Sequence, residues 1–198
     1  MSASETRQQI VEAADELFYH RGYEKTSFSD IADAVRISRG NFYYHFKSKD
    51  EILDAVIKGR LTATRLVLDS WETDAKGPVD CIRSFINILI ANRADIKKYG
   101  CPIGTLSTEL SKFDHVSRVD ANRLFTLFRT WLCEQFEILG CGDNSDRFAM
   151  HLLARSQGVA TLAAAYRDDD FIRREVKEMS DWLDACVKPI AGASRRAG

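Results

Sequence analysis

The sequence predicts an all-α protein, and three observations support that prediction. Apolar residues recur at helical spacing along almost the whole chain of 198 residues. No stretch of useful length alternates apolar and polar residues as a half-buried strand would. Only three prolines and eleven glycines are present, too few for a linker-rich or disordered chain. We therefore expect roughly nine helices, in a chain long enough to bury a sizeable core.

The first predicted helices are bounded by caps and by glycine. A first helix ends at Gly22, where the chain can turn without a side chain. Ser27 and Ser38 are expected as N-caps of two short helices. Ser48 opens a capping box with Glu51, which predicts the start of a long fourth helix. These elements form a compact N-terminal module.

The remaining predicted helices make a larger body. Gly77-Pro78 and Gly100-Cys101-Pro102 interrupt the apolar pattern, and Gly140-Cys141-Gly142 ends a long helix. Two last helices are expected, from about Asp146 to Arg167 and from about Asp170 to Pro189. The predicted domains are a helix-turn-helix DNA-binding domain at 1–50, an effector-binding and dimerisation domain at 51–190 and a disordered tail at 191–198.

Composition limits the class of protein. Charge is nearly balanced, with Lys+Arg 28 against Asp+Glu 29, which excludes a uniformly basic coat for polyanions. The N-terminus is charged throughout and lacks the apolar core of a secretion signal. Uncharged stretches fall short of the roughly 18–20 residues of a membrane span. Five cysteines are scattered without CxxC or zinc spacing. We expect a reduced, cytoplasmic protein with no membrane contact, cofactor or metal.

The second and third predicted helices are joined by only a few residues, as in a helix-turn-helix. Between Arg36 and Lys49 the chain has four basic residues and no acidic one, interleaved with polar and aromatic side chains. This mixture is expected where a helix enters a DNA groove and neighbouring groups hold phosphates. A solvated basic turn over core aromatics has the same composition, so composition alone leaves both interpretations open.

Residue chemistry suggests roles in a DNA complex. Arg39 and Asn41 lie near a helix N-terminus, where Arg pairs with guanine and Asn with adenine. Gly40 allows close approach to DNA. Phe42 and Phe46 are expected to pack inside the module. Phosphate contacts are expected from Thr26, Ser38, Tyr43, Tyr44 and Lys49.

These residues resemble the TetR family of transcriptional regulators. The resemblance covers about residues 6–54 and is densest from Gly40 to Phe46, the run GNFYYHF. It implies a homodimer that represses genes from a palindromic operator and releases it when a small-molecule effector binds the C-terminal body. For His45, the residues alone leave a structural hydrogen bond equally open. The DNA-contacting positions that the resemblance implies are Thr26, Ser38, Arg39, Gly40, Asn41, Tyr43, Tyr44, His45 and Lys49.

The resemblance also places a dimer interface on the final two helices. Small residues there permit close packing, and an apolar stripe follows on the last helix. An internal face of the single chain remains the alternative. The expected interface residues are Ala160, Ala164, Phe171, Met179, Trp182 and Leu183.

The effector side carries one local match. Residues 100–110 resemble the GCxxGxLxxEL element of several TetR branches, one of which senses electrophiles through a cysteine. Cys101 precedes Pro102 at a predicted helix N-terminus near two lysines, a setting that favours a reactive thiolate. Buried packing remains the favoured role for this cysteine. Glu109 is among the polar residues expected to orient an effector, with Arg129 and Gln157. The expected pocket lining is Trp71, Phe85, Leu89, Tyr99, Cys101, Phe113, Phe125, Phe128, Trp131 and Tyr166.

Two other classes remain as alternatives. A thiol-dependent enzyme built on Cys101 is the only catalytic version, because the four histidines are scattered and no phosphate loop is present. A structural DNA-binding protein without effector control is the other. The large aromatic-rich body argues against that class, since DNA binding alone does not need it.

Overall fold

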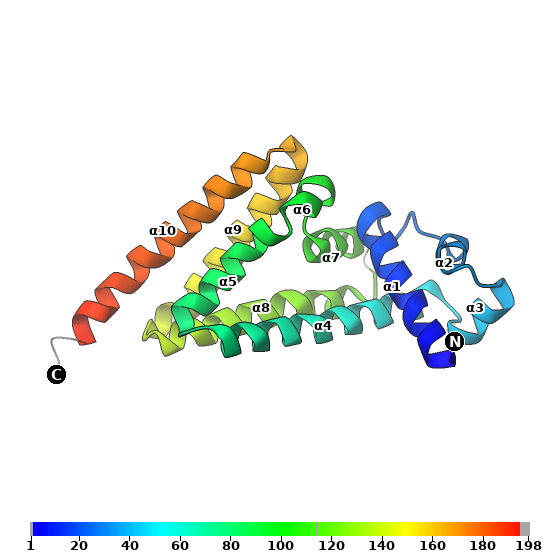
Figure 1. The fold of residues 1–198 in the computed structure, drawn as a ribbon, viewed down its shortest axis with the longest axis horizontal. Coiled ribbons are helices and arrows are strands. Elements are labelled where there is room, and N and C mark those ends of the chain that lie inside the picture. Colours follow the sequence, from blue (N-terminus) through cyan, green and yellow to red (C-terminus); the bar gives the residue numbers. More distant parts are fainter. Residues whose placement is uncertain (1, 114, 195–198) are drawn as a thin grey trace. The chain divides into compact units, whose positions relative to one another are not determined.

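The computed structural model describes the backbone of residues 2–113 and 115–194 and the side chains as far as Val187. All regular structure in these residues is helical, which confirms the all-α prediction. The described residues form one α-helix more than expected. Where the sequence predicted one helix between residues 78 and 99, one helix ends at Ala91 and another begins at Arg93. The elements, labelled in Figure 1, are α1 (Ala3–Arg21), α2 (Phe28–Val35), α3 (Arg39–His45), α4 (Lys49–Asp74), α5 (Pro78–Ala91), α6 (Arg93–Tyr99), α7 (Pro102–Lys112), α8 (Arg118–Ile138), a 3-10 turn (Gly142–Asn144), α9 (Ser145–Tyr166) and α10 (Asp169–Ser194).

The chain forms two compact units that interleave along the sequence. The first combines residues up to Thr64 with Pro102–Leu124, so it includes α7 and the start of α8. The second combines Arg65–Cys101 with the residues from Phe125 onward. The expected boundary at residue 50 falls inside α4, which runs unbroken from Lys49 to Asp74. The expected tail at 191–198 begins inside α10, and residues 195–198 lie outside the described residues.

Local signals determine the helix ends in the first unit. Ser27 accepts the Asp30 backbone N–H and Asp30 accepts the Ser27 backbone N–H, a reciprocal capping box. Ser38 caps α3 by accepting the backbone N–H of Asn41. Gly22 ends α1 with a φ of 93°, a region that side chains disfavour. The expected boundaries at these residues are confirmed.

The core of the first unit forms where the apolar faces of its helices meet. In Figure 1, α1 to α3 lie together at the blue end of the chain, and α1 packs on α2 and on α7. Removing this apolar surface from water is the main stabilising term. Side chains less than 2% exposed here include Ile10, Ile31, Phe42, Phe46, Ile52, Leu53 and Leu110.

The second unit is a helical bundle. In it α10 packs along α5 and α9, and α6 packs on α9. Phe136, Phe148 and Trp182 form an aromatic cluster with ring centroids 5.5 to 6.3 Å apart. Arg155 on α9 binds Glu175 on α10 at 2.9 Å. Across residues 2–113 and 115–194, no helix is both long and apolar enough to cross a lipid bilayer.

Candidate nucleic-acid interface

The joint between α2 and α3 is short and fixed. Arg36 ends α2 in the left-handed region, with a φ of 56°, and Ser38 already caps α3. Phe42 on α3 is 1% exposed and meets the Phe28 ring edge-on at 5.1 Å. The two short helices therefore form a rigid helix-turn-helix in which α3 cannot rotate freely.

One face of α3 is left uncovered by the first unit. Tyr43 is 50% and Tyr44 71% exposed, which is unusual for large aromatic side chains. Phe42 and Phe46 are each 1% exposed, which confirms that they pack internally. His45 is half-buried against the Tyr44 ring. Of the sequence-predicted DNA contacts, the structure brings together on this exposed face Ser38, Arg39, Gly40, Asn41, Tyr43 and Tyr44.

Two of the sequence-predicted phosphate contacts point inward instead. Thr26 is 1% exposed, and its hydroxyl donates to the Gly22 carbonyl at 2.8 Å. Its expected phosphate contact is therefore corrected, because this hydroxyl holds the turn between α1 and α2. Lys49 is half-buried, donates from Nζ to the Tyr23 carbonyl at 3.0 Å and lies 4.1 Å from the centroid of the Tyr23 ring.

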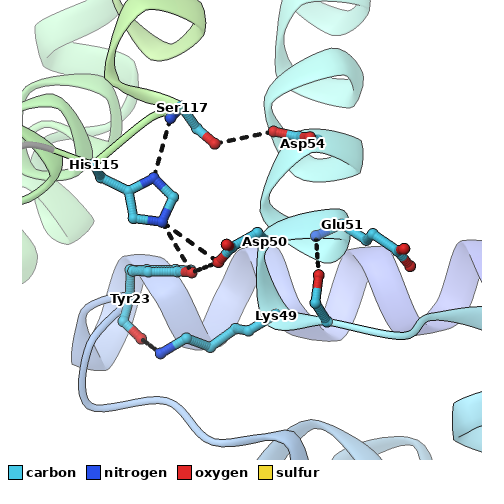
Figure 2. A network of polar contacts seen from close by, with 8 residues as sticks. Tyr23, Lys49, Asp50, Glu51, Asp54, His115 and Ser117 are labelled. Atoms are coloured by element: carbon cyan, nitrogen blue, oxygen red, sulfur yellow. Dashed lines mark hydrogen bonds and ion pairs between the residues drawn. The ribbon is translucent and has the colours of Figure 1, made fainter.

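A polar network joins the same turn to α4 and to the segment that leads into α8 (Figure 2). The Tyr23 hydroxyl donates to Asp50 Oδ1 at 2.5 Å. His115 Nε2 lies 3.3 Å from the Tyr23 oxygen and 3.4 Å from Asp50 Oδ1. The Ser117 backbone N–H donates to His115 Nδ1, and the Ser117 hydroxyl donates to Asp54, each at 3.1 Å. Because Nδ1 accepts, the network assigns the ring proton to Nε2.

The network shifts the pKa values of Asp50 and Tyr23 in opposite directions. The hydrogen bond from Tyr23 holds the pKa of Asp50 below its usual value. Burial, followed by the hydrogen bond to Asp50, raises the pKa of Tyr23 well above its usual value. Both shifts favour the observed pair of a phenol donor and an ionised carboxylate.

The lowered pKa of Asp50 predicts an acid-sensitive first unit. A carboxylate with a depressed folded pKa stabilises fully above its unfolded pKa of about 3.9 and loses that contribution as pH falls through the folded pKa. Urea unfolding between about pH 3 and pH 6 should show a smaller acid loss for Asp50→Asn than for the wild type. Asp33→Asn, on an exposed site of α2, is the matched control. Identical pH profiles for wild type and Asp50→Asn would contradict this role.

Glu109 on α7 makes the most informative contact of the first unit. Its carboxylate accepts the backbone N–H groups of Tyr23 and Glu24, each at 2.9 Å. The fit is tight, because a Cβ on Gly22 would lie 3.0 Å from Glu109 Oε1. Arg60 adds a second link by donating to Asp15 on α1 and to the Pro102 carbonyl, each at 2.7 Å.

Sequence reasoning expected Glu109 to orient an effector, but in the structure its carboxylate binds the turn between α1 and α2. The side chain is half-buried, and both carboxylate oxygens bind backbone N–H groups 85 and 86 residues away. The sequence signal was its place as the glutamate of the GCxxGxLxxEL element. Leu106 and Leu110 of the same element are buried. The element therefore joins α7 to the turn that follows α1.

Several predicted effector contacts belong to the aromatic core of the second unit. Phe85 meets Phe128 at 5.5 Å between centroids, and Trp71 meets Trp131 at 5.7 Å. Trp131 Nε1–H donates to Glu72 at 2.7 Å. Leu89 is buried, and the half-buried residues of the predicted set are Trp71, Tyr99, Cys101 and Phe125.

Two members of the predicted lining lie at the surface. Phe113 is 58% and Tyr166 77% exposed. Among the polar residues, Arg129 pairs with Asp146 through two hydrogen bonds of 2.7 Å on an exposed surface. Helical spacing predicted that Phe113 and Tyr166 belong to apolar stripes. The spacing does not show which end of a stripe reaches solvent.

The predicted interface residues of α9 and α10 divide into two sets. Ala160, Met179 and Leu183 are at most 1% exposed inside the second unit, so they have no surface to offer a second copy. The prediction is corrected at these three positions, because their stripes face each other within one chain. The half-buried members are Ala164, Phe171 and Trp182.

Comparisons with known proteins agree with this geometry. The sequence pattern described as "Bacterial regulatory proteins, tetR family" matches residues 10–56. The chain is 30% identical over 167 residues to an uncharacterized HTH-type transcriptional regulator of Lactococcus lactis, covering 82% of this chain and 85% of that protein. It is 31% identical over 125 residues to the HTH-type transcriptional repressor DhaR of a Mycobacterium species, covering 63% of this chain and 62% of that protein.

A solved structure extends the likeness to nearly the whole fold. A TetR transcriptional regulator from Legionella pneumophila superposes with a TM-score of 0.76 at 27% identity, over 89% of this chain and 94% of that chain. The helix-turn-helix defines the class, a DNA-binding transcriptional regulator. The chain belongs to the TetR family of bacterial regulatory proteins.

Proposed function

We propose that this protein is a homodimeric repressor that binds a palindromic operator through α3 and releases it when a small molecule binds the second unit. The observation that carries the proposal is the uncovered face of α3, where Arg39 and Asn41 are exposed on a helix fixed by buried Phe42. Arg and Asn are the side chains that read guanine and adenine in the major groove. The relative DhaR is named as a repressor, which supports the direction of control.

An exposed stripe on α9 supports the homodimer. Ala154, Gly158, Leu162, Ala165 and Tyr166 follow helical spacing and are all exposed. A Cβ at Gly158 would meet nothing within 4 Å among the described residues, so the single chain gives no reason for a glycine there. Small residues between larger apolar ones let two helices approach closely. A second copy that covers this stripe would give a dimer with two α3 helices, the number that a palindrome requires.

The contact between Glu109 and the turn that follows α1 supports effector control. The second unit includes Arg65–Cys101, and α7 begins at the next residue, Pro102. The Glu109 carboxylate on α7 binds the backbone of the turn that precedes α2. A displacement of α7 would therefore act on the helix-turn-helix through a hydrogen-bonded connection. Effector binding to the second unit is proposed to cause that displacement.

Gly40 gives a prediction with two opposite effects. A Cβ at Gly40 would meet nothing within 4 Å among the described residues, so Gly40→Ala should stabilise α3 by about 0.5–1 kcal/mol. The same methyl group would stand between α3 and DNA, so operator affinity should fall. Gly59→Ala, at an exposed site of α4, also has open space around its Cβ. It is the matched control, which should gain stability and keep its operator affinity. Unchanged operator affinity in Gly40→Ala would place the DNA surface elsewhere.

Selection from a random duplex library with the full chain tests the proposed function. We expect an enriched inverted repeat bound by two chains, with the mass of the complex measured by analytical ultracentrifugation. Tyr166→Asp should reduce dimerisation and operator affinity together, because it buries a charge in the proposed interface. Binding of all duplexes with equal affinity, or of one chain to an unrepeated site, would contradict the proposal.

A further inference from the structure

A small cavity lies between α2 and α3, on the helix-turn-helix itself. Its volume is about 70 Å³, and its lining residues are Phe28, Ser29, Ala32, Arg39, Phe42 and Tyr43. Arg39 is exposed and Tyr43 is 50% exposed, so the cavity borders the uncovered face of α3. It is not part of the aromatic core of the second unit.

The cavity has apolar walls that cannot easily collapse. Phe28 stacks on Tyr43 with centroids 5.6 Å apart and an interplanar angle of 28°. Phe28 also meets Phe42 at 5.1 Å, and both Phe42 and Ala32 are buried. The Phe42 ring and the Ala32 methyl group keep their positions because each is buried and held from several sides. The inner wall of the cavity is therefore a fixed feature of the surface.

The size of the cavity limits its occupant. It exceeds the roughly 30 Å³ that one water molecule occupies in the liquid. It is far below the roughly 300 Å³ at which small-molecule pockets begin, so a drug-sized effector does not fit. A methyl group fits, and apolar walls favour one over water. In the major groove, the methyl group that a protein meets is the C5-methyl of thymine.

The rim of the cavity supplies a polar partner beside the apolar walls. Arg39 Nη2 lies 3.5 Å from Ser29 Oγ, so the guanidinium lies at the edge of the cavity. A guanidinium in this position can donate to O6 and N7 of a guanine. The walls and the rim together match a thymine methyl group next to a guanine.

We propose that this cavity accepts the C5-methyl group of a thymine that neighbours a guanine bound by Arg39. The inference rests on the proposed function, because it requires α3 to enter the major groove. It deepens that function by assigning Phe28, Ala32 and Tyr43 to sequence recognition through shape. Phe28 and Ala32 lie on α2, so α2 takes part in base recognition as well as in support of α3.

The test uses the duplex enriched by the full chain, with each dT replaced in turn by dU. This replacement removes one methyl group and keeps every hydrogen-bonding group of the base. We expect the Kd to rise about three- to tenfold at one thymine per half-site, adjacent to a guanine. No sensitive thymine would overturn the inference and leave specific DNA binding intact. Absence of any specific duplex would overturn the proposed function and this inference together.

A variant that fills the cavity tests whether the cavity causes the difference in Kd between dT and dU duplexes. Ala32→Val adds two methyl groups to the lining, so we expect weaker binding of the dT duplex and the same Kd for dT and dU. Ala34→Val on the exposed side of α2 should retain the sensitivity of the wild type. Retained sensitivity in a folded Ala32→Val protein would show that the methyl group binds elsewhere. If Ala32→Val does not fold, the dU scan of the wild type decides alone.

Discussion

An Arg39→Ala protein should lose the preference for one base pair in each operator half-site. The discrimination at that pair should fall by about 1–3 kcal/mol, the worth of a bidentate contact between arginine and guanine. Other positions should keep their preferences, because Arg39 lies at an exposed site of α3. Fluorescence anisotropy on duplexes with single base-pair changes measures this loss.

Lys25→Ala is the control for Arg39→Ala, because it removes one positive charge from another exposed site of the first unit. If Lys25 contacts a phosphate, its loss should weaken binding of every duplex equally and reduce the salt dependence, without changing the preference for any base pair. If Arg39→Ala weakened all duplexes equally, Arg39 would be a phosphate contact. The assignment of the guanine would then be wrong.

Glu109→Gln should lower the free energy of unfolding by about 2 kcal/mol and weaken operator binding. A carboxylate accepts both backbone N–H groups at 2.9 Å, whereas an amide brings its own donors to one of them. Hydrogen exchange at the amides of Tyr23 and Glu24 should accelerate more than exchange in α1. Urea unfolding and exchange measured by mass spectrometry report the two effects.

Glu16→Gln, at an exposed site of α1, is the control for Glu109→Gln and should leave both quantities unchanged. Equal exchange rates at Tyr23 and Glu24 in Glu109→Gln and wild type would contradict a role for the carboxylate in holding this turn. A loss of stability without any change in operator affinity would restrict Glu109 to folding. The proposed route from α7 to the DNA-binding helices would then fail.

The sequence predicted the local features of the fold because their causes are local. Ser27 and Ser38 accept backbone N–H groups three residues away, and Gly22 ends α1 within the same turn. Such signals lie within a few residues of the boundary that they set. The split between α5 and α6 was missed, since Asn92 has no side-chain hydrogen bond as N-cap of α6 and no glycine or proline stands there.

The candidate site was predicted in part, and the errors share a tertiary cause. Thr26 has the chemistry of a phosphate contact, but its hydroxyl is buried against the Gly22 carbonyl. Met179 and Leu183 belong to an apolar stripe that suits an interface and a core equally well. The contact of Glu109 with residues 23 and 24 joins segments too far apart for any local pattern to reveal.

We infer that the exposed face of α3 reads DNA sequence. The most direct measurement compares the wild type with an Arg39→Ala, Asn41→Ala double variant on the selected duplex and on a scrambled duplex of equal length. Both proteins should bind the scrambled duplex with similar affinity, and only the wild type should bind the selected duplex at least 100-fold more tightly, about 2.7 kcal/mol. Equal preference for the selected duplex in both proteins would contradict the account.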